Sequence, residues 1–333
     1  MPEHDDVTET PARHPYLELP EEAFWRAAVS ARAPEEITGL WQPKFAIGPE
    51  DRIVTAGSCF AQHIGRALAG RGYGWIDAEP APEGMAPAAK LAHHYGTFSF
   101  RTGNIYTANM LAQWLEWALG AQPMPDEVWE RDGRVFDPFR PAIEPQGFAS
   151  RAALQASREA TLAAIRAAVA EATVFVFTLG LTESWQERET GVEYAICPGT
   201  LAGTFDPARH QFVNHDFDDT LMRLGDAIGL LRRANPGIRV LLTVSPVPLT
   251  ATASGNHVLV ATGWSKAVLR AVAGEIAAED ARVDYFPSYE IITGPPFGGR
   301  FYAENLRQVR PEGVAFVMDS FFRDQAAHFG TAA

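Results

Sequence analysis

Ser58 stands at a position where backbone geometry favours a nucleophile. An apolar run at 52–56 ends at Gly57, and apolar residues then recur at helical spacing up to Gly70, which predicts a strand, a tight turn and a helix. Free N–H groups and the dipole at a helix N-terminus stabilise an oxyanion, so Ser58 is a candidate for acyl transfer. The alternative is that Ser58 only caps the helix, although Ala61 offers no capping-box partner.

The same alternation of helix and strand recurs along the chain. Amphipathic helices are predicted before three later strands, and a helix at 265–279 precedes the last of them. The predicted strands are 52–56, 73–76, 173–177, 238–244 and 283–286. Strands that are apolar almost throughout suit a parallel sheet covered on both faces. The sequence therefore predicts a doubly wound, flavodoxin-like α/β fold with a five-stranded parallel sheet.

A chain of 333 residues is long enough for about two domains, or for one α/β domain with insertions. Residues 1–15 are acidic and polar and are predicted to form a disordered tail. Residues 16–330 are predicted to form a single domain. The stretch 78–150 is too long for one crossover, so an insertion that forms a cap over the edge of the sheet is expected there.

Composition and charge narrow the range of partners. The formal net charge of −13 argues against a nucleic-acid partner and against adsorption to an anionic membrane. No dinucleotide, Walker A or zinc-ligand spacing occurs, so neither a cofactor nor a metal is predicted. The N-terminus lacks a signal-peptide pattern, and no apolar run reaches about 18 residues, which predicts a cytoplasmic protein.

The segment 57–61 reads Gly-Ser-Cys-Phe-Ala and resembles the signature of the GSCFA domain family, which is similar to the SGNH (GDSL-like) hydrolases. Further matching segments follow in order at 103–107, 243–248, 265–266 and 286–290. The resemblance implies an SGNH-hydrolase-like fold. It also implies a serine-dependent acyl-ester hydrolase or O-acyltransferase, whose partner is a small acyl ester or a saccharide.

The resemblance also implies roles for single residues. Ser58 matches the SGNH nucleophile, and its own N–H would hold the oxyanion together with Gly103 and Asn104, which match the second block. Thr182 and Glu183 match the third block, where Thr182 stands in place of an asparagine whose side chain donates to the oxyanion. Loss of one such donor typically lowers the rate by about 10² to 10³.

The usual general base of the SGNH pattern is missing. Asn305 and Gln308 occupy the positions of its Asp-x-x-His pair, and neither amide accepts a proton near pH 7. None of the nine histidines has an aspartate three residues before it. This departure favours a second hypothesis, a catalytically degenerate SGNH-like domain that binds a glycan or acyl ligand without turnover.

Other residues beyond strand ends are candidates for the missing role, because ligands of open α/β sheets bind there. His257 is the preferred base, with Glu183 or Glu290 as its acid partner; the alternative is a surface or capping residue. Lys266 would bind an anionic substrate group or act as a base, or else lie in solvent in the first turn of a helix. Ser245 ends the fourth strand and is expected to shape the floor of the pocket.

Five further residues are candidates for the site. Cys59 would be a second nucleophile beside the serine, or a buried cysteine that behaves as a small hydrophobic residue. His93 and His94 would reach over the site from the insertion. Trp185 would line a sugar-binding or acyl-binding cleft, as would Trp264, or both would be core residues.

Overall fold

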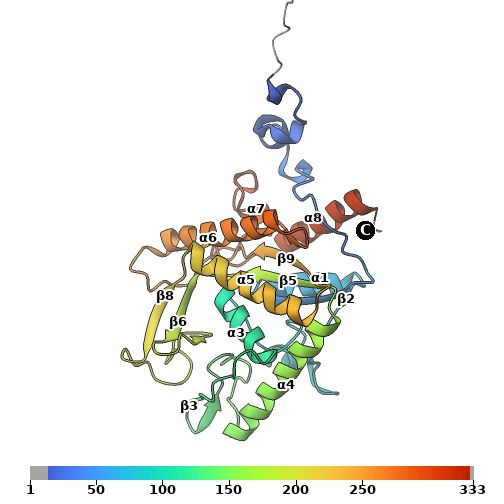
Figure 1. The fold of residues 1–333 in the computed structure, drawn as a ribbon. Coiled ribbons are helices and arrows are strands. Elements are labelled where there is room, and N and C mark those ends of the chain that lie inside the picture. The colour runs from blue at the N-terminus through green and yellow to red at the C-terminus, as the bar shows by residue number, and fades with distance from the viewer. Residues whose placement is uncertain (1–13, 331–333) are drawn as a thin grey trace, which may run out of the picture.

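The computed structural model describes residues 14–330 and centres on one parallel sheet. Its strands are β1 (Arg52–Gly57), β2 (Gly74–Trp75), β5 (Val174–Leu179), β9 (Arg239–Val244) and β10 (Val283–Tyr285). They lie in the order β10-β9-β5-β1-β2 (Figure 1). This order is the flavodoxin-like, doubly wound one. The predicted five-stranded parallel α/β sheet is confirmed.

Alternate residues of the central strands face two separate hydrophobic clusters. Val54, Phe175 and Phe177 belong to the larger cluster, whereas Ile53 and Val176 belong to the other. All six residues of β5 are buried, because β1 and β9 pair with it on its two sides and helices cover both its faces. An apolar run without polar alternation is what such a position requires.

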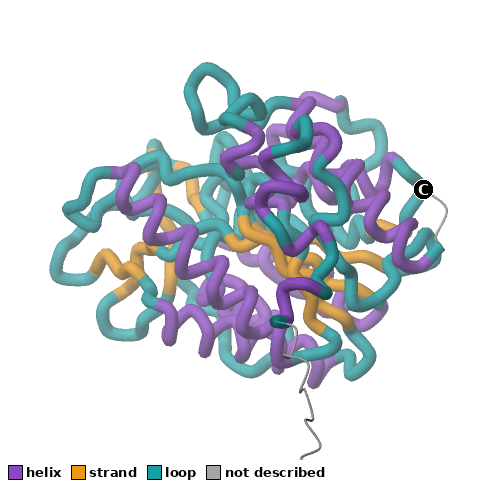
Figure 2. The backbone as a smooth tube through the Cα atoms, turned by 90° about the horizontal axis from the view of Figure 1, so that it is seen from above, coloured by secondary structure: helices purple, strands orange, loops and turns teal. Residues whose placement is uncertain are grey.

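Helices cover both faces of the sheet (Figure 2). The larger cluster takes residues from α3 (Ala108–Ala118), α4 (Arg151–Glu171), α5 (Phe217–Ala234) and α6 (Val258–Glu279). The other cluster takes residues from α1 (Ala61–Gly70), α7 (Ser288–Thr293) and α8 (Pro311–Phe329). The helix predicted at 265–279 begins seven residues earlier, at Val258, which changes the environment of its polar residues.

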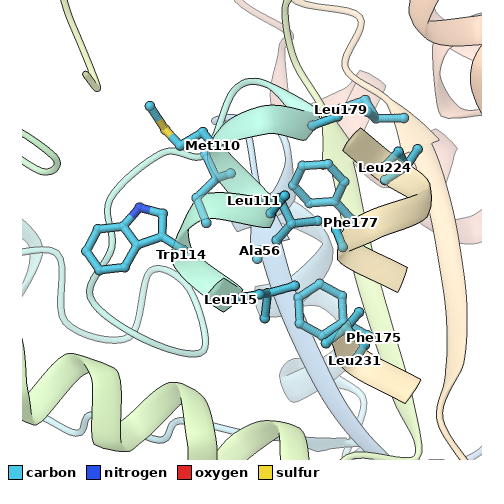
Figure 3. Close-up of a cluster of buried hydrophobic side chains, with 14 of the residues drawn as sticks. Ala56, Met110, Leu111, Trp114, Leu115, Phe175, Phe177, Leu179, Leu224 and Leu231 are labelled. Carbon is cyan, nitrogen blue, oxygen red and sulfur yellow. The ribbon is translucent and has the colours of Figure 1, made fainter. Parts of the chain in front are cut away.

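The predicted insertion at 78–150 contributes to the core as well as to the surface. It holds α2 (Pro87–Ala92), α3 and the hairpin of β3 (Trp129–Arg131) with β4 (Arg134–Phe136). Figure 3 shows Leu111 and Leu115 of α3 against Phe175 and Phe177 of the sheet. The helix therefore lies on a face of the sheet, where the sequence suggested a cap over its edge.

A small antiparallel sheet follows the end of β5. It consists of β6 (Glu183–Glu187), β7 (Glu193–Tyr194) and β8 (His210–Asn214), in the order β7-β6-β8. The sequence predicts none of these strands. The reason is that β6 buries the polar residues Ser184 and Gln186, so an alternation of apolar and polar residues is absent.

The two ends of the chain differ in how they meet the sheet. Residues 1–13 and 331–333 lie outside the described residues, and with them most of the predicted tail at 1–15. Residues 14–36 extend away from the sheet and carry only short helical turns without buried residues (Figure 1). No helix between residues 14 and 330 combines the length and the apolar character that crossing a bilayer would take.

Candidate active site

Ser58 follows the central strand β1 directly. Gly57 has φ +135°, and a Cβ there would lie 2.4 Å from Thr178 O, so the tight turn requires glycine. The Ser58 side chain is buried, and its Oγ has no hydrogen-bond partner among residues 14–330. The helix α1 begins at Ala61 with no side-chain cap, which excludes Ser58 as an N-cap. A buried hydroxyl without a partner calls for an explanation such as catalysis.

A cavity of about 580 Å³ lies at the carboxyl ends of the central strands. Ser58, Gly180 and Ser245 line it, and each directly follows one of the strands β1, β5 and β9. Its remaining wall is largely apolar and comes from Met110, Leu181, Trp185, Ile196, Phe212, Val247 and Leu249. An apolar cavity with a few convergent polar groups at this edge of a sheet is typical of a small-molecule site.

Several residues named from the sequence meet in this cavity. Glu183 lines it and accepts a hydrogen bond of 2.6 Å from Thr252 Oγ1. Ser245 also lines it and accepts one of 3.3 Å from the backbone N–H of Val247. Trp185 is part of its wall, whereas Trp264 lies exposed on α6 outside it.

The residues expected to hold the oxyanion are arranged differently. The N–H of Ser58 donates to Thr178 O at 3.0 Å and is therefore occupied. Gly103 and Asn104 do not line the cavity, although Tyr106 of the same loop does. Thr182 is buried, and its hydroxyl donates to Asn214 Oδ1 at 2.7 Å. Two of these donors are thus occupied by other acceptors, and Gly103 and Asn104 lie outside the lining of the cavity.

His257 lies away from the cavity. It is exposed and caps α6, where its Nδ1 accepts the N–H of Leu259 at 3.2 Å. The structure thus supports its capping alternative, because the helix begins at Val258 and fixes the side chain at its first turn. Within residues 14–330 no histidine lines the cavity, and this includes His93 and His94.

Asn305 and Gln308, which stand in place of the Asp-x-x-His pair, both lie at the surface. Asn305 is exposed, and its Oδ1 accepts hydrogen bonds from the N–H groups of Arg307 and Gln308. Gln308 is exposed as well. Arg307, between them, lines the cavity and is held by a hydrogen bond of 3.1 Å from its Nε to Pro248 O.

Lys266 is buried, where the sequence left solvent exposure as one alternative, and it does not itself line the cavity. It is only 2% exposed, and its Nζ donates to Gly180 O at 2.6 Å. Burial lowers the pKa of Lys266 to about 7; the nearby Cys59 thiol opposes this shift and the Arg307 guanidinium adds to it. Within the described chain it forms no ion pair with a carboxylate.

Cys59 lines the cavity beside Ser58. Burial raises the pKa of its thiol, although the charges of Arg307 and Lys266 oppose the shift. The thiol is therefore the main form at neutral pH, which favours the interpretation of Cys59 as a small hydrophobic residue.

The GSCFA family model matches residues 52–321. The chain belongs to the GSCFA family. Its fold is also similar to two solved esterases: an acetyl esterase serine-to-alanine variant with an acetate ion (11% identity, TM-score 0.37) and a carbohydrate esterase of family 3 from Talaromyces cellulolyticus (10% identity, TM-score 0.36). The alignments cover 83% and 84% of this chain and 96% and 99% of the esterases. No curated protein matches the sequence.

This GSCFA protein has a polar cluster beside the cavity that the sequence does not predict. His215 Nε2 lies 3.2 Å from Ser184 Oγ and 3.4 Å from Glu193 Oε2. Thr107 Oγ1 and Asn109 Nδ2 donate to the same buried carboxylate. Ser184, Glu193 and Thr107 line the cavity. No sequence signal marks this cluster, because the small antiparallel sheet brings it together.

The donor set for a metal ion is also absent from the part of the GSCFA chain that the structure describes. No group of three or more histidine, cysteine, aspartate or glutamate side chains gathers there in a way that could hold an ion.

Proposed function

We propose that this GSCFA protein is a serine-dependent acyl-ester hydrolase or O-acyltransferase with Ser58 as its nucleophile. The observation that carries the proposal is the Oγ of Ser58, buried without a partner on the cavity at the carboxyl end of the central strand. A hydroxyl in this position is held ready for a ligand, because no group of the described chain competes for it.

The proposed reaction has two halves. Ser58 Oγ forms a bond to the acyl carbon of the ester, and the alcohol leaves with a proton, so that an acyl-serine remains. Water or a second alcohol then takes the acyl group and regenerates the hydroxyl. The N–H groups of Cys59 and Phe60 precede α1 and donate to no backbone carbonyl in the described residues. They are the proposed donors to the oxyanion.

The lining of the cavity supports an ester with an apolar acyl part. Met110, Leu181 and Ile196 provide an apolar wall for it, since apolar contact stabilises by about 25 cal/mol per Å² removed from water. Trp185 and Phe212 form an aromatic wall with ring centroids 5.7 Å apart. A saccharide hydroxyl, which the family resemblance implies, is the proposed alcohol on this side.

A second candidate function is binding of an acyl or glycan ligand without turnover. The observation that favours it is that no histidine of residues 14–330 lines the cavity and that Asn305 and Gln308 face outward. In this case Ser58 would donate to the ligand without forming a bond to it.

Labelling with a fluorophosphonate probe, followed by intact mass and peptide mapping, tests the proposal. We expect one adduct on wild-type protein at Ser58, its loss in Ser58→Ala, and loss of p-nitrophenyl acetate hydrolysis in the same variant. Ser320→Ala is a matched control, because Ser320 is a buried serine of α8 that bonds Phe316 O. We expect His257→Ala to label like wild type.

Two results would count against the assignment. An adduct that persists in Ser58→Ala and disappears in Ser184→Ala would move the nucleophile to β6, beside His215. A folded wild-type protein that forms no adduct and hydrolyses no ester, yet binds acyl sugars, would establish the binding domain.

A further inference from the structure

We propose that Lys266 is the general base that takes the hydroxyl proton of Ser58, in place of the histidine that the site lacks. This inference rests on the proposed function and adds the residue that activates its nucleophile. Lys266 comes from the third turn of α6, whereas Asn305 and Gln308 stand in the segment before α8.

Gly180 connects the two side chains. Its carbonyl oxygen accepts the hydrogen bond of Lys266 Nζ at 2.6 Å. Its Cα approaches the serine so closely that a Cβ at position 180 would lie 2.9 Å from the Cβ of Ser58. The amine and the serine therefore meet the same residue, directly after β5. Gly180 O is the only hydrogen-bond partner of the amine in the described chain. The lone pair of the neutral amine is therefore free to accept a proton from a neighbouring group.

Burial favours the neutral amine of Lys266, whereas the charges around it act in opposite directions. The titratable groups that act on it are Cys59 from the turn after β1 and Arg307 from the segment before α8. Burial is the largest influence and lowers its pKa to about 7. A base with a pKa near the working pH is efficient, because much of it is free to accept a proton and its conjugate acid can return the proton.

The proton balance of the step is complete with this residue. The neutral Nζ takes the proton of Ser58 as Oγ bonds to the acyl carbon. The resulting ammonium then protonates the oxygen of the departing alcohol, which leaves an acyl-serine and a neutral amine. In the second half the amine takes a proton from water or from the acceptor alcohol and returns it to Ser58 Oγ. No co-reactant beyond ester and acceptor is needed.

Two other interpretations make different predictions. Lys266 could have a purely structural role, tying α6 to the end of β5 through Gly180 O. Alternatively His215 could be the base; its Nε2 contacts Ser184, Gln186 and Glu193, and like Lys266 it does not itself line the cavity. Lys266→Arg tests the structural role. Arginine keeps a donor for Gly180 O, but it stays protonated and cannot act as a base.

The experiment compares the rate of fluorophosphonate labelling of Ser58 from pH 5 to 10 in wild type, Lys266→Met, Lys266→Arg and His215→Gln. Lys44→Met is the matched control: Lys44 Nζ also holds α6, by donating to the backbone oxygen of Ala277 in its last turn and to that of Asp280 just after it. We expect the wild-type rate to rise with pH through about 7 and then level off. In both Lys266 variants it should fall by about 10² to 10⁴ and lose this rise.

A second measurement observes the amine itself. The chain contains only three lysines, so protein labelled with [¹³C]lysine gives few signals in NMR, and Lys266→Met assigns one of them. We expect this signal to titrate near pH 7. Circular dichroism and thermal unfolding of each variant verify the fold.

The outcomes separate the failure of this inference from failure of the proposed function. Wild type that labels at Ser58 while Lys266→Arg labels equally fast, or while only His215→Gln loses the rise near pH 7, overturns the role of Lys266 and keeps the serine enzyme. A Lys266 signal that stays protonated above pH 9 also overturns it. Absence of any Ser58 adduct on folded wild type overturns both.

Discussion

Gly180 separates Ser58 from the backbone of Tyr106. A Cβ at this position would lie 2.9 Å from the Ser58 Cβ and 3.0 Å from Tyr106 O. Alanine therefore has to displace the serine. We expect Gly180→Ala to lower Ser58 labelling and ester hydrolysis by about 10², since a displacement of 1 Å near the chemistry has an effect of that size.

The control for this substitution is another glycine. A Cβ on Gly225, within α5, would meet nothing within 4 Å. Gly225→Ala should keep full labelling and raise the free energy of unfolding by up to about 1 kcal/mol, because alanine favours the helix. Equal labelling of Gly180→Ala and wild type would show that the serine tolerates the added methyl group.

The two cysteines provide a pH test of the same cavity. Cys59 and Cys197 both line it, and burial raises the pKa of each thiol above its ordinary value. A raised pKa leaves little thiolate at pH 7, so alkylation by iodoacetamide should be slow there and should accelerate as the pH rises beyond about 9. Intact mass of Cys59→Ser and Cys197→Ser identifies each site. Fast alkylation at pH 7 would contradict the burial of these thiols.

At the scale of single residues, the sequence indicates Ser58 but not its environment. The tight turn at Gly57 follows from local spacing, and the structure has the serine at that turn. The burial of Lys266 depends on where α6 begins. Thr262 and Gly263 are weak helix formers, and Leu259 and Trp264 are apolar but exposed, so the pattern does not mark the true start at Val258.

At the scale of elements, strands of the parallel sheet are predictable and those of the antiparallel one are not. The apolar runs of β5 and β9 are local signals that a sheet covered on both faces requires. In contrast, β6 buries Ser184 and Gln186, whose partner His215 comes from a distant segment. Such polar burial is stabilised by contacts that sequence spacing does not reveal.

A buried ion cluster attaches the hairpin segment to α4. The carboxylate of Asp137 lies 2.8 Å from Arg140 Nε and 2.8 Å from Arg158 Nη2. Burial by itself raises the pKa of Asp137, but the two guanidiniums outweigh it and hold the pKa below its ordinary value. We expect Asp137→Asn to lower the free energy of unfolding by about 3 to 5 kcal/mol in urea titrations at pH 7, because two buried cations lose their partner.

The pH dependence of this effect has a definite sign. Because the folded pKa of Asp137 lies below its unfolded value near 4, its stabilisation is present at neutral pH and disappears as the pH falls through the folded pKa. The difference between wild type and Asp137→Asn should therefore shrink below about pH 4. Asp319→Asn, which breaks an exposed pair with Arg71, should change stability by at most about 1 kcal/mol. Similar effects of the two substitutions would contradict a dominant buried cluster.

At the scale of the whole molecule, the cavity depends on segments from most of the chain. Residues that line it come from the turn after β1, the loop before α3, the small sheet, the loop after β9 and the segment before α8. Bringing these loops to one edge is a consequence of parallel topology, because all five strands end there. Residues 14–36 take no part in this assembly.

The N-terminal segment provides the last prediction. Tyr16 and Trp25 are more than 60% exposed, and the first buried residue of the hydrophobic core is Ile37. A chain that begins at residue 33 should have a free energy of unfolding within about 0.5 kcal/mol of that of the full chain and should label Ser58 at the same rate.

A chain that begins at residue 43 also loses Trp41, whose Nε1 donates to Asp284 at 3.2 Å and whose ring stacks on Phe321. It should lose about 3 to 5 kcal/mol, the effect of removing a buried tryptophan. Thermal and urea unfolding measure both truncations, and equal stability of the two would show that the sheet does not need this anchor.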